Sequence, residues 1–253
     1  MKTYENFKVD IHHCDASGNL KASALLKFMQ ECSTLQLNES SISQRSLLEQ
    51  GRSYVLTRLN MSIYKPVHAY EEIEISTWPC ESRGFSFNRC YQARLDGNIV
   101  AEATTVWGII DFGKGRLCRV SDFECDIETD EPLELDSPAR IHIPSDLELS
   151  LVGERTVVYS DLDSNGHINN TNYPDILCDF IPEMNNKRIL MLGLSYVSEA
   201  VHGEILKVYM TQSDGQYYIR TVKSDGSTNC EAIIMPETIT PVYNIRMLMG
   251  GNN

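Results

Sequence analysis

The stretch SDLDSNGHINNTNY, residues 160–173, holds the densest group of polar side chains that could do chemistry. It places Asp163, Asn165 and His167 at alternate positions, so a carboxylate, an amide and an imidazole stand close together in the chain. An imidazole can transfer a proton near neutral pH, and the other two groups can orient it or hold a polarised carbonyl oxygen. A fourth candidate, Glu199, ends the segment LGLSYVSE further along the chain. These four are the candidate catalytic residues.

The same stretch also resembles the start of a calcium-binding loop. Asp161, Asp163, Asn165 and Gly166 fit the D-x-D-x-N-G opening of an EF-hand. Position twelve, where an EF-hand needs a bidentate glutamate, is Asn172, and the preceding residues RTVVYS predict a strand where an EF-hand has a helix. We therefore favour a catalytic loop, and expect neither a metal nor a cofactor.

An internal repeat indicates which elements position these residues. DASGNLKASALL, starting at Asp15, aligns without a gap with DSNGHINNTNYP, starting at Asp163. Two further pairs follow in the same order: LNMSIYKPVHAYEEIEI with LGLSYVSEAVHGEILKV, and RLDGNIVAEATTVWGII with KSDGSTNCEAIIMP. Three pairs in one order indicate a duplicated unit.

Each repeat is predicted to contain a loop, one helix and an antiparallel meander. Apolar residues at helical spacing in KASALLKFMQECSTLQL and NNTNYPDILCDFI predict the helices. A helix lying across a curled sheet buries the apolar faces of both, so the fold class is α+β. We expect an N-terminal domain at 1–128, a Pro- and Asp-rich linker at 129–146 and a C-terminal domain at 147–253. The strands are expected at 55–64, 71–79, 85–95, 98–111, 189–197, 205–212, 216–223 and 230–234.

The two repeats differ at the groups suited to proton transfer. Asn19 stands where the second repeat has His167, and Lys65 stands where it has Glu199. The C-terminal half is therefore expected to be catalytic, and the N-terminal half a degenerate copy.

Composition excludes several classes of function. The formal net charge is -13, which disfavours nucleic acid as a partner because phosphate binding needs a basic face. No apolar run is long enough to predict a membrane span. The N-terminus lacks the apolar region of a signal peptide, and the eight cysteines show no disulfide framework, so we expect a cytoplasmic protein with reduced thiols.

These motifs resemble those of one enzyme family. SDLDSNGHINNTNYPDIL is similar to the D-x-N-x-H-x-N-N motif of the acyl-acyl-carrier-protein thioesterases, and the glutamate of LSYVSEAV matches that family's second signature. The resemblance implies a tandem double hot-dog fold, in which each half is a long helix wrapped by a curled antiparallel sheet. It also implies hydrolysis of fatty acyl-[acyl carrier protein] to free fatty acid and holo-carrier protein in fatty acid biosynthesis. Without an organellar transit segment, the chain resembles the bacterial branch.

The resemblance assigns the family's catalytic residues to Asp163, Asn165, His167 and Glu199. It implies an acyl carrier protein with a 4'-phosphopantetheine-linked acyl chain as the partner, and leaves open a homodimer. Ala200 stands where many plant members have a cysteine, so a cysteine nucleophile is absent there. The nucleophile is then a water activated by Glu199 and His167, with Asn165 and helix N-terminal amides at the carbonyl oxygen, or Asp163 itself.

In this family the acyl chain is attributed to the first half, between helix and sheet. Both acyl carrier protein and coenzyme A are anionic, so a basic patch is expected at 114–119 with Arg58, Arg83 or Arg155. The alternatives are an acyl-CoA thioesterase that uses the same site and a non-enzymatic acyl- or calcium-binding module. The candidates for the apolar slot are Leu25, Phe28, Met29, Met61, Ile63 and Trp107.

Overall fold

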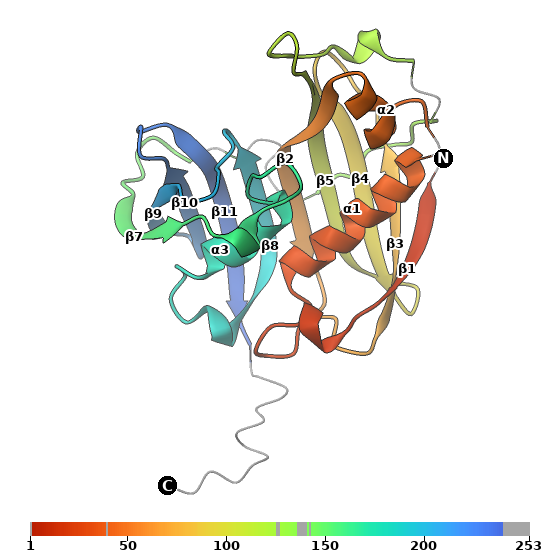
Figure 1. Ribbon diagram of the computed structural model, residues 1–253. Helices are drawn as coiled ribbons and strands as arrows, with labels where there is room; N and C mark the ends of the chain where they lie inside the picture. The colour runs from red at the N-terminus through yellow and green to blue at the C-terminus, as the bar shows by residue number, and fades with distance from the viewer. Residues whose placement is uncertain (1, 39, 125–126, 136–140, 142, 240–253) are drawn as a thin grey trace, which may run out of the picture.

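The alternating segments of both halves form one curled antiparallel sheet (Figure 1). The computed structural model describes residues 2–38, 40–124, 127–135, 141 and 143–239. Within them the sheet runs in the order β1-β3-β4-β5-β2-β8-β11-β10-β9-β7, with β6 paired to β5. The strands are β1 (Thr3–Lys8), β2 (Arg52–Ile63), β3 (Glu72–Pro79), β4 (Phe87–Leu95), β5 (Asn98–Asp111), β6 (Arg116–Leu117), β7 (Ser150–Thr156), β8 (Lys187–Tyr196), β9 (Ile205–Ser213), β10 (Gln216–Val222) and β11 (Thr228–Thr238).

The two halves meet where β2 pairs antiparallel with β8. Helix α1 (Ala22–Asn38) lies across the strands of the N-terminal half, and α2 (Gln44–Glu49) follows it (Figure 1). Helix α3 (Tyr173–Cys178) covers the C-terminal half and contacts α1. Because both helices bury an apolar face against the sheet, residues of both halves join one hydrophobic core. The α+β class is confirmed.

The eight predicted strands are all present, and each of their ends lies within four residues of its predicted position. The predicted Asp-Gly turns close the β4–β5 and β10–β11 hairpins. β1 and α2 were not predicted. The strand predicted at 155–160 ends earlier, as β7, because the carboxylate of Asp161 accepts the N–H of Val158 and the chain turns into a 3-10 helix at Tyr159–Asp161.

The helix of the second half is shorter than predicted. It has six residues, against 17 in α1. A 3-10 helix at Asn170–Asn172 replaces its expected first turn, and Pro174 stands directly after its first residue. Proline is tolerated only in the first turn of a helix, so α3 begins there, and it ends before Asp179.

The predicted linker is described at 129–135 and at 141 and 143–146, whereas 136–140 and 142 lie outside the described residues. The indole N–H of Trp78 donates to the carbonyl of Glu131, and the N–H of Asp130 donates to the carbonyl of Pro79. The first part of the linker is thus bonded to the end of β3. The domain limits remain a prediction. In the described part of the chain, no helix combines the length and apolar character needed to cross a membrane.

Candidate active site

The candidate catalytic loop of the second half is a tight turn built on Asp163. One carboxylate oxygen of Asp163 accepts the backbone N–H of Asn165 at 2.8 Å and that of His167 at 3.3 Å. Gly166 has a φ of +80°, a conformation that glycine adopts without steric cost. Asp163 therefore orients His167 through the backbone, while the exposed Asn165 stands at the tip of the turn.

The first half contains the same turn. The carboxylate of Asp15 accepts the N–H of Ser17 at 2.8 Å and that of Asn19 at 3.0 Å, and Gly18 also has a φ of +80°. The duplication predicted from the sequence thus extends to hydrogen bonds. It also shows that the turn forms without a histidine, so the aspartate has a structural role in both copies.

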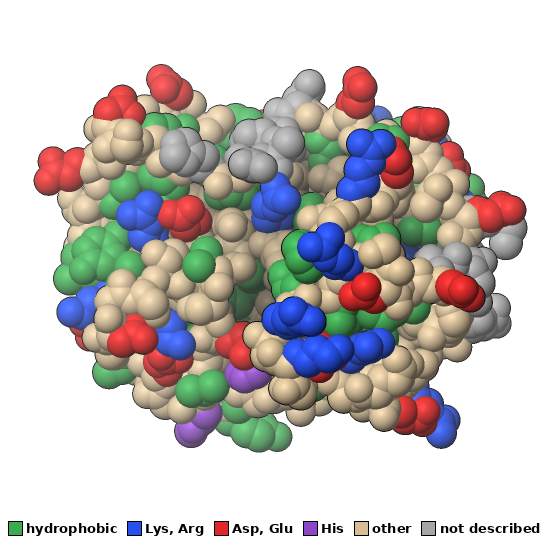
Figure 2. Space-filling view, turned by 90° about the horizontal axis from the view of Figure 1, so that it is seen from above, with side chains coloured by type: hydrophobic (Ala, Val, Ile, Leu, Met, Phe, Trp, Pro, Cys, Tyr) green, Lys and Arg blue, Asp and Glu red, His purple; other side chains and the backbone are tan. Residues whose placement is uncertain are grey.

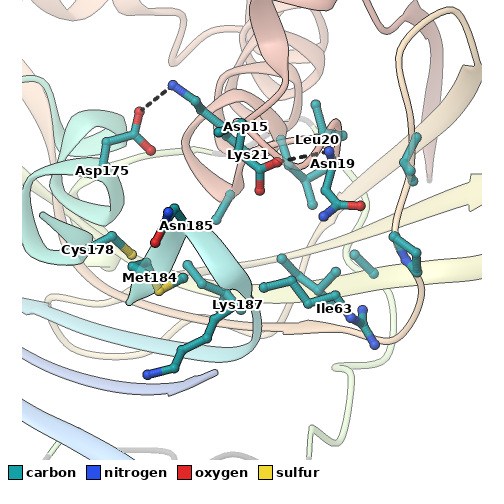
Figure 3. Close-up of a pocket in the computed structure, with 18 of the residues that line it drawn as sticks. Asp15, Asn19, Leu20, Lys21, Ile63, Asp175, Cys178, Met184, Asn185 and Lys187 are labelled. Atoms are coloured by element: carbon teal, nitrogen blue, oxygen red, sulfur yellow. Dashed lines mark hydrogen bonds and ion pairs between the residues drawn. The ribbon is translucent and has the colours of Figure 1, made fainter. Parts of the chain in front are cut away.

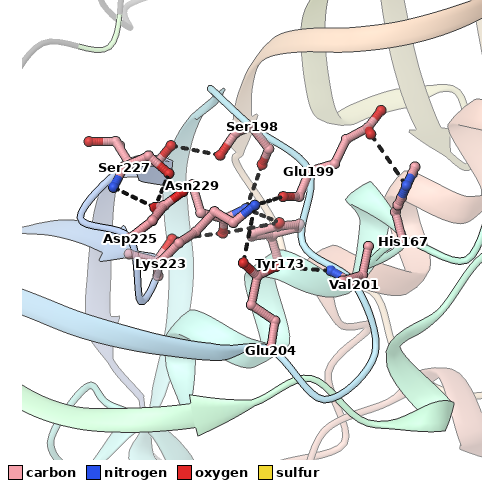
Figure 4. Close-up of polar contacts among 12 residues, drawn as sticks. His167, Tyr173, Ser198, Glu199, Val201, Glu204, Lys223, Asp225, Ser227 and Asn229 are labelled. Atoms are coloured by element: carbon pink, nitrogen blue, oxygen red, sulfur yellow. Dashed lines mark hydrogen bonds and ion pairs between the residues drawn. The ribbon is translucent and has the colours of Figure 1, made fainter.

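The structure brings His167 and Glu199 together (Figure 4). The Nε2 atom of His167 lies 3.3 Å from Oε2 of Glu199, with the two side chains 30% and 62% exposed. The N–H of Ile168 donates to the carbonyl of Ala200 at 3.0 Å and so joins the two loops. An imidazole and a carboxylate in contact and reachable from solvent are suited to general acid-base chemistry on a bound substrate.

Asp161 holds the start of the loop that carries His167. Its carboxylate accepts from Nη2 of Arg155 at 2.6 Å and from the N–H of Val158 at 2.8 Å, and its carbonyl accepts the N–H of Asn169. The first ligand position of an EF-hand loop is therefore already occupied by an arginine, and a strand and a 3-10 helix precede the loop, so an EF-hand does not fit. Arg155, a candidate for the basic patch, is held in this ion pair instead.

Lys223 and Asn229 hold the glutamate loop (Figure 4). The ammonium of Lys223 donates to the carbonyl of Glu199 at 2.9 Å and pairs with Glu204 at 3.1 Å. The amide of Asn229 donates to the carbonyl of Ser198 at 2.6 Å. The chain immediately before Glu199 and the glutamate's own carbonyl are thus both fixed, which sets where its side chain starts. Neither Lys223 nor Asn229 was predicted from the sequence to position Glu199.

Two tyrosines fix the segment that follows His167. The hydroxyl of Tyr196 donates to the carbonyl of Asn170 at 2.9 Å, and the hydroxyl of Tyr173 is bonded to Asn229. Burial raises the pKa of both tyrosine hydroxyl groups, so they remain neutral at physiological pH. Their role is to hold the loop.

The amides before α3 do not fit the predicted role at a carbonyl oxygen. The N–H of Thr171 donates to the side chain of Asn169 and the N–H of Asn172 donates to its carbonyl. These two donors are used internally and are not available to a carbonyl oxygen, whereas the role of the amides of α3 itself stays a prediction. The exposed amide of Asn165 is the remaining predicted donor.

A cavity of about 770 Å³ borders the catalytic loop. It lies between the second half of α1 and the ends of β3 and β4, and Ser164 of the catalytic loop lies at its edge. This volume is in the range of small-molecule binding sites. Its apolar lining includes Leu37, Tyr54, Phe87, Trp107 and Phe123.

Only Trp107 among the predicted slot residues lines this cavity. Met29 and Met61 belong to the solid core, while Phe28 stacks on Phe7. Leu25 and Ile63 line a different, smaller cavity. The first half of α1 faces the core, and its second half faces the large cavity.

Basic side chains gather over the N-terminal half beside a hollow (Figure 2). Lys114, Arg116 and Arg119 are exposed, but Lys114 is paired with Asp111 at 3.3 Å. Next to Arg119, Val120 lines the large cavity. The predicted segment 114–119 therefore borders the cavity that reaches the catalytic loop. Arg83 of the predicted patch is paired with Glu81 at 2.6 Å.

Sequence models of known families match most of the chain. The model described as the acyl-ACP thioesterase N-terminal domain matches residues 1–127, and the one for the C-terminal domain matches residues 145–237. The chain belongs to the acyl-ACP thioesterase family. The palmitoyl-acyl carrier protein thioesterase of Gossypium hirsutum is 21% identical over 246 residues, which cover 91% of this chain and 59% of that protein. An oleoyl-acyl carrier protein thioesterase of Arabidopsis thaliana is 27% identical over 195 residues, which cover 69% and 52%. The chain thus spans between half and three fifths of these acyl-ACP thioesterases.

Solved structures of the acyl-ACP thioesterase family share the fold. A crystal structure from Bacteroides thetaiotaomicron superposes with a TM-score of 0.84 at 24% identity, covering 93% of this chain and 98% of the other. The 12:0-ACP thioesterase from Umbellularia californica gives 0.78 at 16% identity, covering 94% and 97%. The double hot-dog fold implied by the sequence motifs is confirmed.

Proposed function

We propose that this protein hydrolyses a fatty acyl thioester of acyl carrier protein to free fatty acid and holo-carrier protein. The observation that carries the proposal is the contact between His167 and Glu199, together with the large, mainly apolar cavity that the His167 loop borders at Ser164. Family membership supports the reaction class. Asp163, Asn165, His167 and Glu199 are the proposed site residues.

The nucleophile is a water molecule activated by the His167–Glu199 pair. The water oxygen attacks the thioester carbon while one of its protons passes to the pair, and the carbonyl electrons move to the oxygen. The tetrahedral intermediate then expels the thiolate, which takes up a proton from His167. We assign the donation to the developing oxyanion to the exposed side-chain amide of Asn165, which in the structure lies 3.5 Å from Oδ2 of Asp163. Direct attack by Asp163 is disfavoured. Two backbone N–H groups donate to one carboxylate oxygen and stabilise its negative charge, which makes the carboxylate a weaker nucleophile.

The acyl chain occupies the cavity of about 770 Å³, with its thioester end at the catalytic loop. Burial of methylene groups against Leu37 and Trp107 supplies about 0.8 kcal/mol each. The cavity lies between α1 and the sheet of the N-terminal half, so that half binds the acyl chain while the C-terminal half carries the reacting groups.

The partner is an acyl carrier protein, which presents a phosphopantetheine arm from an acidic surface. Arg116 and Arg119 are exposed near the cavity and offer the positive charge that such a partner needs, despite the acidic net charge. Coenzyme A carries the same arm, so an acyl-CoA thioesterase is the second candidate. The cytoplasmic location and a homodimer remain predictions.

Free-thiol release from a panel of acyl-carrier-protein and matching coenzyme A thioesters tests the proposal. Wild type, His167→Ala and the control His202→Ala should be compared, since His202 is exposed and outside the His167–Glu199 pair. We expect turnover of the carrier-protein substrates, lost in His167→Ala and kept in His202→Ala. A preference for coenzyme A would overturn the partner, and release that is indifferent to His167 would overturn the site.

A further inference from the structure

A second cavity, of about 310 Å³, occupies the pseudo-equivalent place in the N-terminal half (Figure 3). Its edge is the loop that carries Asp15 and Asn19, and across it lie the last turn of α3 and the start of β8. The catalytic loop faces the second half of α1 and Tyr54 near the start of β2 in the same way. The duplication has thus produced two clefts, each between the aspartate turn of one half and the helix of the other.

This second cleft lacks the histidine–glutamate pair of the second half. Asn19 occupies the position of His167, and Lys65 that of Glu199. Where the second half has an imidazole and a carboxylate in contact, the second cleft is lined by an amide and an ammonium. Lys65 is exposed, and its ammonium forms no ion pair with any residue that the structure describes. Such a cleft is suited to binding an anion rather than to general acid-base chemistry.

The charges around the cleft favour a single negative charge. Four cationic and three acidic side chains line it, which leaves one positive charge in excess in a chain whose net charge is -13. The carboxylate of Asp15 accepts two backbone N–H groups, and Lys21 pairs with Asp175 at 3.7 Å (Figure 3). Lys187 donates to the carbonyl of Pro182. Lys65 is therefore the cation left for a ligand.

Arg188 supplies a second donor at this cleft. Its Nε and Nη2 atoms bind Glu237, but its buried Nη1 atom has no hydrogen-bond partner among the described residues. Because Arg188 lines the same cavity as Lys65, its guanidinium adds a second positive charge near the place where a carboxylate head would lie.

Most of the uncharged side chains in the wall are apolar. Leu25, Ile63, Val67 and Ile189 line the cavity, and Met184 adds a flexible side chain. At about 30 Å³ for a water-sized group, the cavity holds a chain of about eight to ten carbons. The apolar part of the wall is therefore matched to a hydrocarbon chain. A phosphate dianion would instead meet the carboxylates of Asp15, Asp175 and Asp179 and would use little apolar surface.

We propose that the degenerate cleft of the N-terminal half binds a medium-chain carboxylate, with its head at Lys65 and Arg188 and its chain against Leu25 and Ile63. The site is separate from the catalytic loop and takes the same ligand class as the product of the proposed reaction. Binding is a property of the cleft itself and stands whether or not the protein hydrolyses thioesters.

Titration calorimetry with decanoate on the full chain tests the proposal. Wild type should bind two decanoates, one in each cavity, whereas Lys65→Glu should weaken one site at least tenfold and leave the other unchanged. Lys27→Glu, an equal charge change at an exposed residue of α1 away from the cleft, is the matched control and should retain both sites. Equal binding by Lys65→Glu and Lys27→Glu would overturn the proposal.

Two further probes identify the site and the ligand class. A crystal grown with 10-bromodecanoate should show bromine signal between Leu25 and Ile63, and signal only in the larger cavity would overturn the proposal. Decanol should lose the Lys65-dependent site, because it has no charge for Lys65. If 4'-phosphopantetheine displaced decanoate from that site and bound it more tightly, the assignment to a carboxylate would be wrong.

Discussion

Lys223→Met tests whether the support of Glu199 is needed for catalysis. The substitution keeps most of the apolar stem but removes the ammonium that lies 2.9 Å from the Glu199 carbonyl and 3.1 Å from Glu204. The side chains of Lys223 and Glu204 are 20% and 17% exposed, so solvent screens them only in part. Hydrogen bonds to charged groups contribute about 1.5–3 kcal/mol, and an exposed pair at most about 1 kcal/mol. We expect the free energy of unfolding to fall by about 2–3 kcal/mol.

The same change should lower kcat by about 10- to 100-fold. Without the ammonium, the Glu199 backbone loses its anchor, and a displacement of about 1 Å at a catalytic group costs about that much. KM should change little, because the apolar cavity is untouched. The two effects are measured by urea unfolding and by steady-state thiol release at a temperature where the variant is fully folded.

The double variant Lys223→Met/Glu204→Gln separates positioning from stability. Neutralising the carboxylate left unpaired should restore about 1–2 kcal/mol of the free energy of unfolding, since an uncompensated charge is the main cost. It should not restore kcat, since the Glu199 carbonyl still lacks its donor. A fully folded Lys223→Met protein with wild-type kcat would refute the argument and leave Lys223 with a structural role alone.

Two more predictions follow from the duplicated turn and the basic segment. Asp15→Asn and Asp163→Asn each keep one acceptor oxygen for the same turn, so both should lower the free energy of unfolding by less than about 1 kcal/mol. A catalytic role for Asp163 predicts a loss of kcat in Asp163→Asn alone. Equal kcat in the two variants would restrict the role of Asp163 to the turn. Arg116→Glu/Arg119→Glu should raise KM for acyl-carrier-protein substrates about tenfold at low salt, with kcat unchanged and the difference shrinking as salt rises. An unchanged KM would move the docking surface elsewhere.

The duplication made much of the fold predictable. The Asp-Gly hairpins and the repeated aspartate turn depend on local chemistry, so the limits of β5 match the prediction at both ends and the two turns have the same hydrogen bonds. β1 was missed although its residues alternate between half-buried and exposed, because a six-residue alternation at a chain end is a weak signal by itself. The length of α3 was overestimated because the apolar spacing continues past the points where Pro174 and the 3-10 turn limit the helix.

The candidate site was predictable only in its central pair. His167 and Glu199 are adjacent because their two loops meet in the C-terminal half, where the N–H of Ile168 donates to the carbonyl of Ala200, as the motif implied. The residues that position the Glu199 loop come from other parts of the chain. Lys223 follows β10 and Asn229 lies in β11, and no spacing rule links either residue to Glu199. The predicted slot residues are divided between the core and two cavities, because helical periodicity identifies an apolar face but not which part of it packs tightly.

The proposed mechanism requires Glu199, with His167, to activate the attacking water. The most direct test compares kcat for an acyl-carrier-protein thioester between wild type, Glu199→Gln and Glu72→Gln, the last being an exposed carboxylate on the non-catalytic half. We expect Glu199→Gln to lower kcat by about a hundredfold or more with little change in stability, while Glu72→Gln retains wild-type kcat. Near-wild-type kcat in folded Glu199→Gln would contradict this mechanism and remove Glu199 from the proton-transfer step.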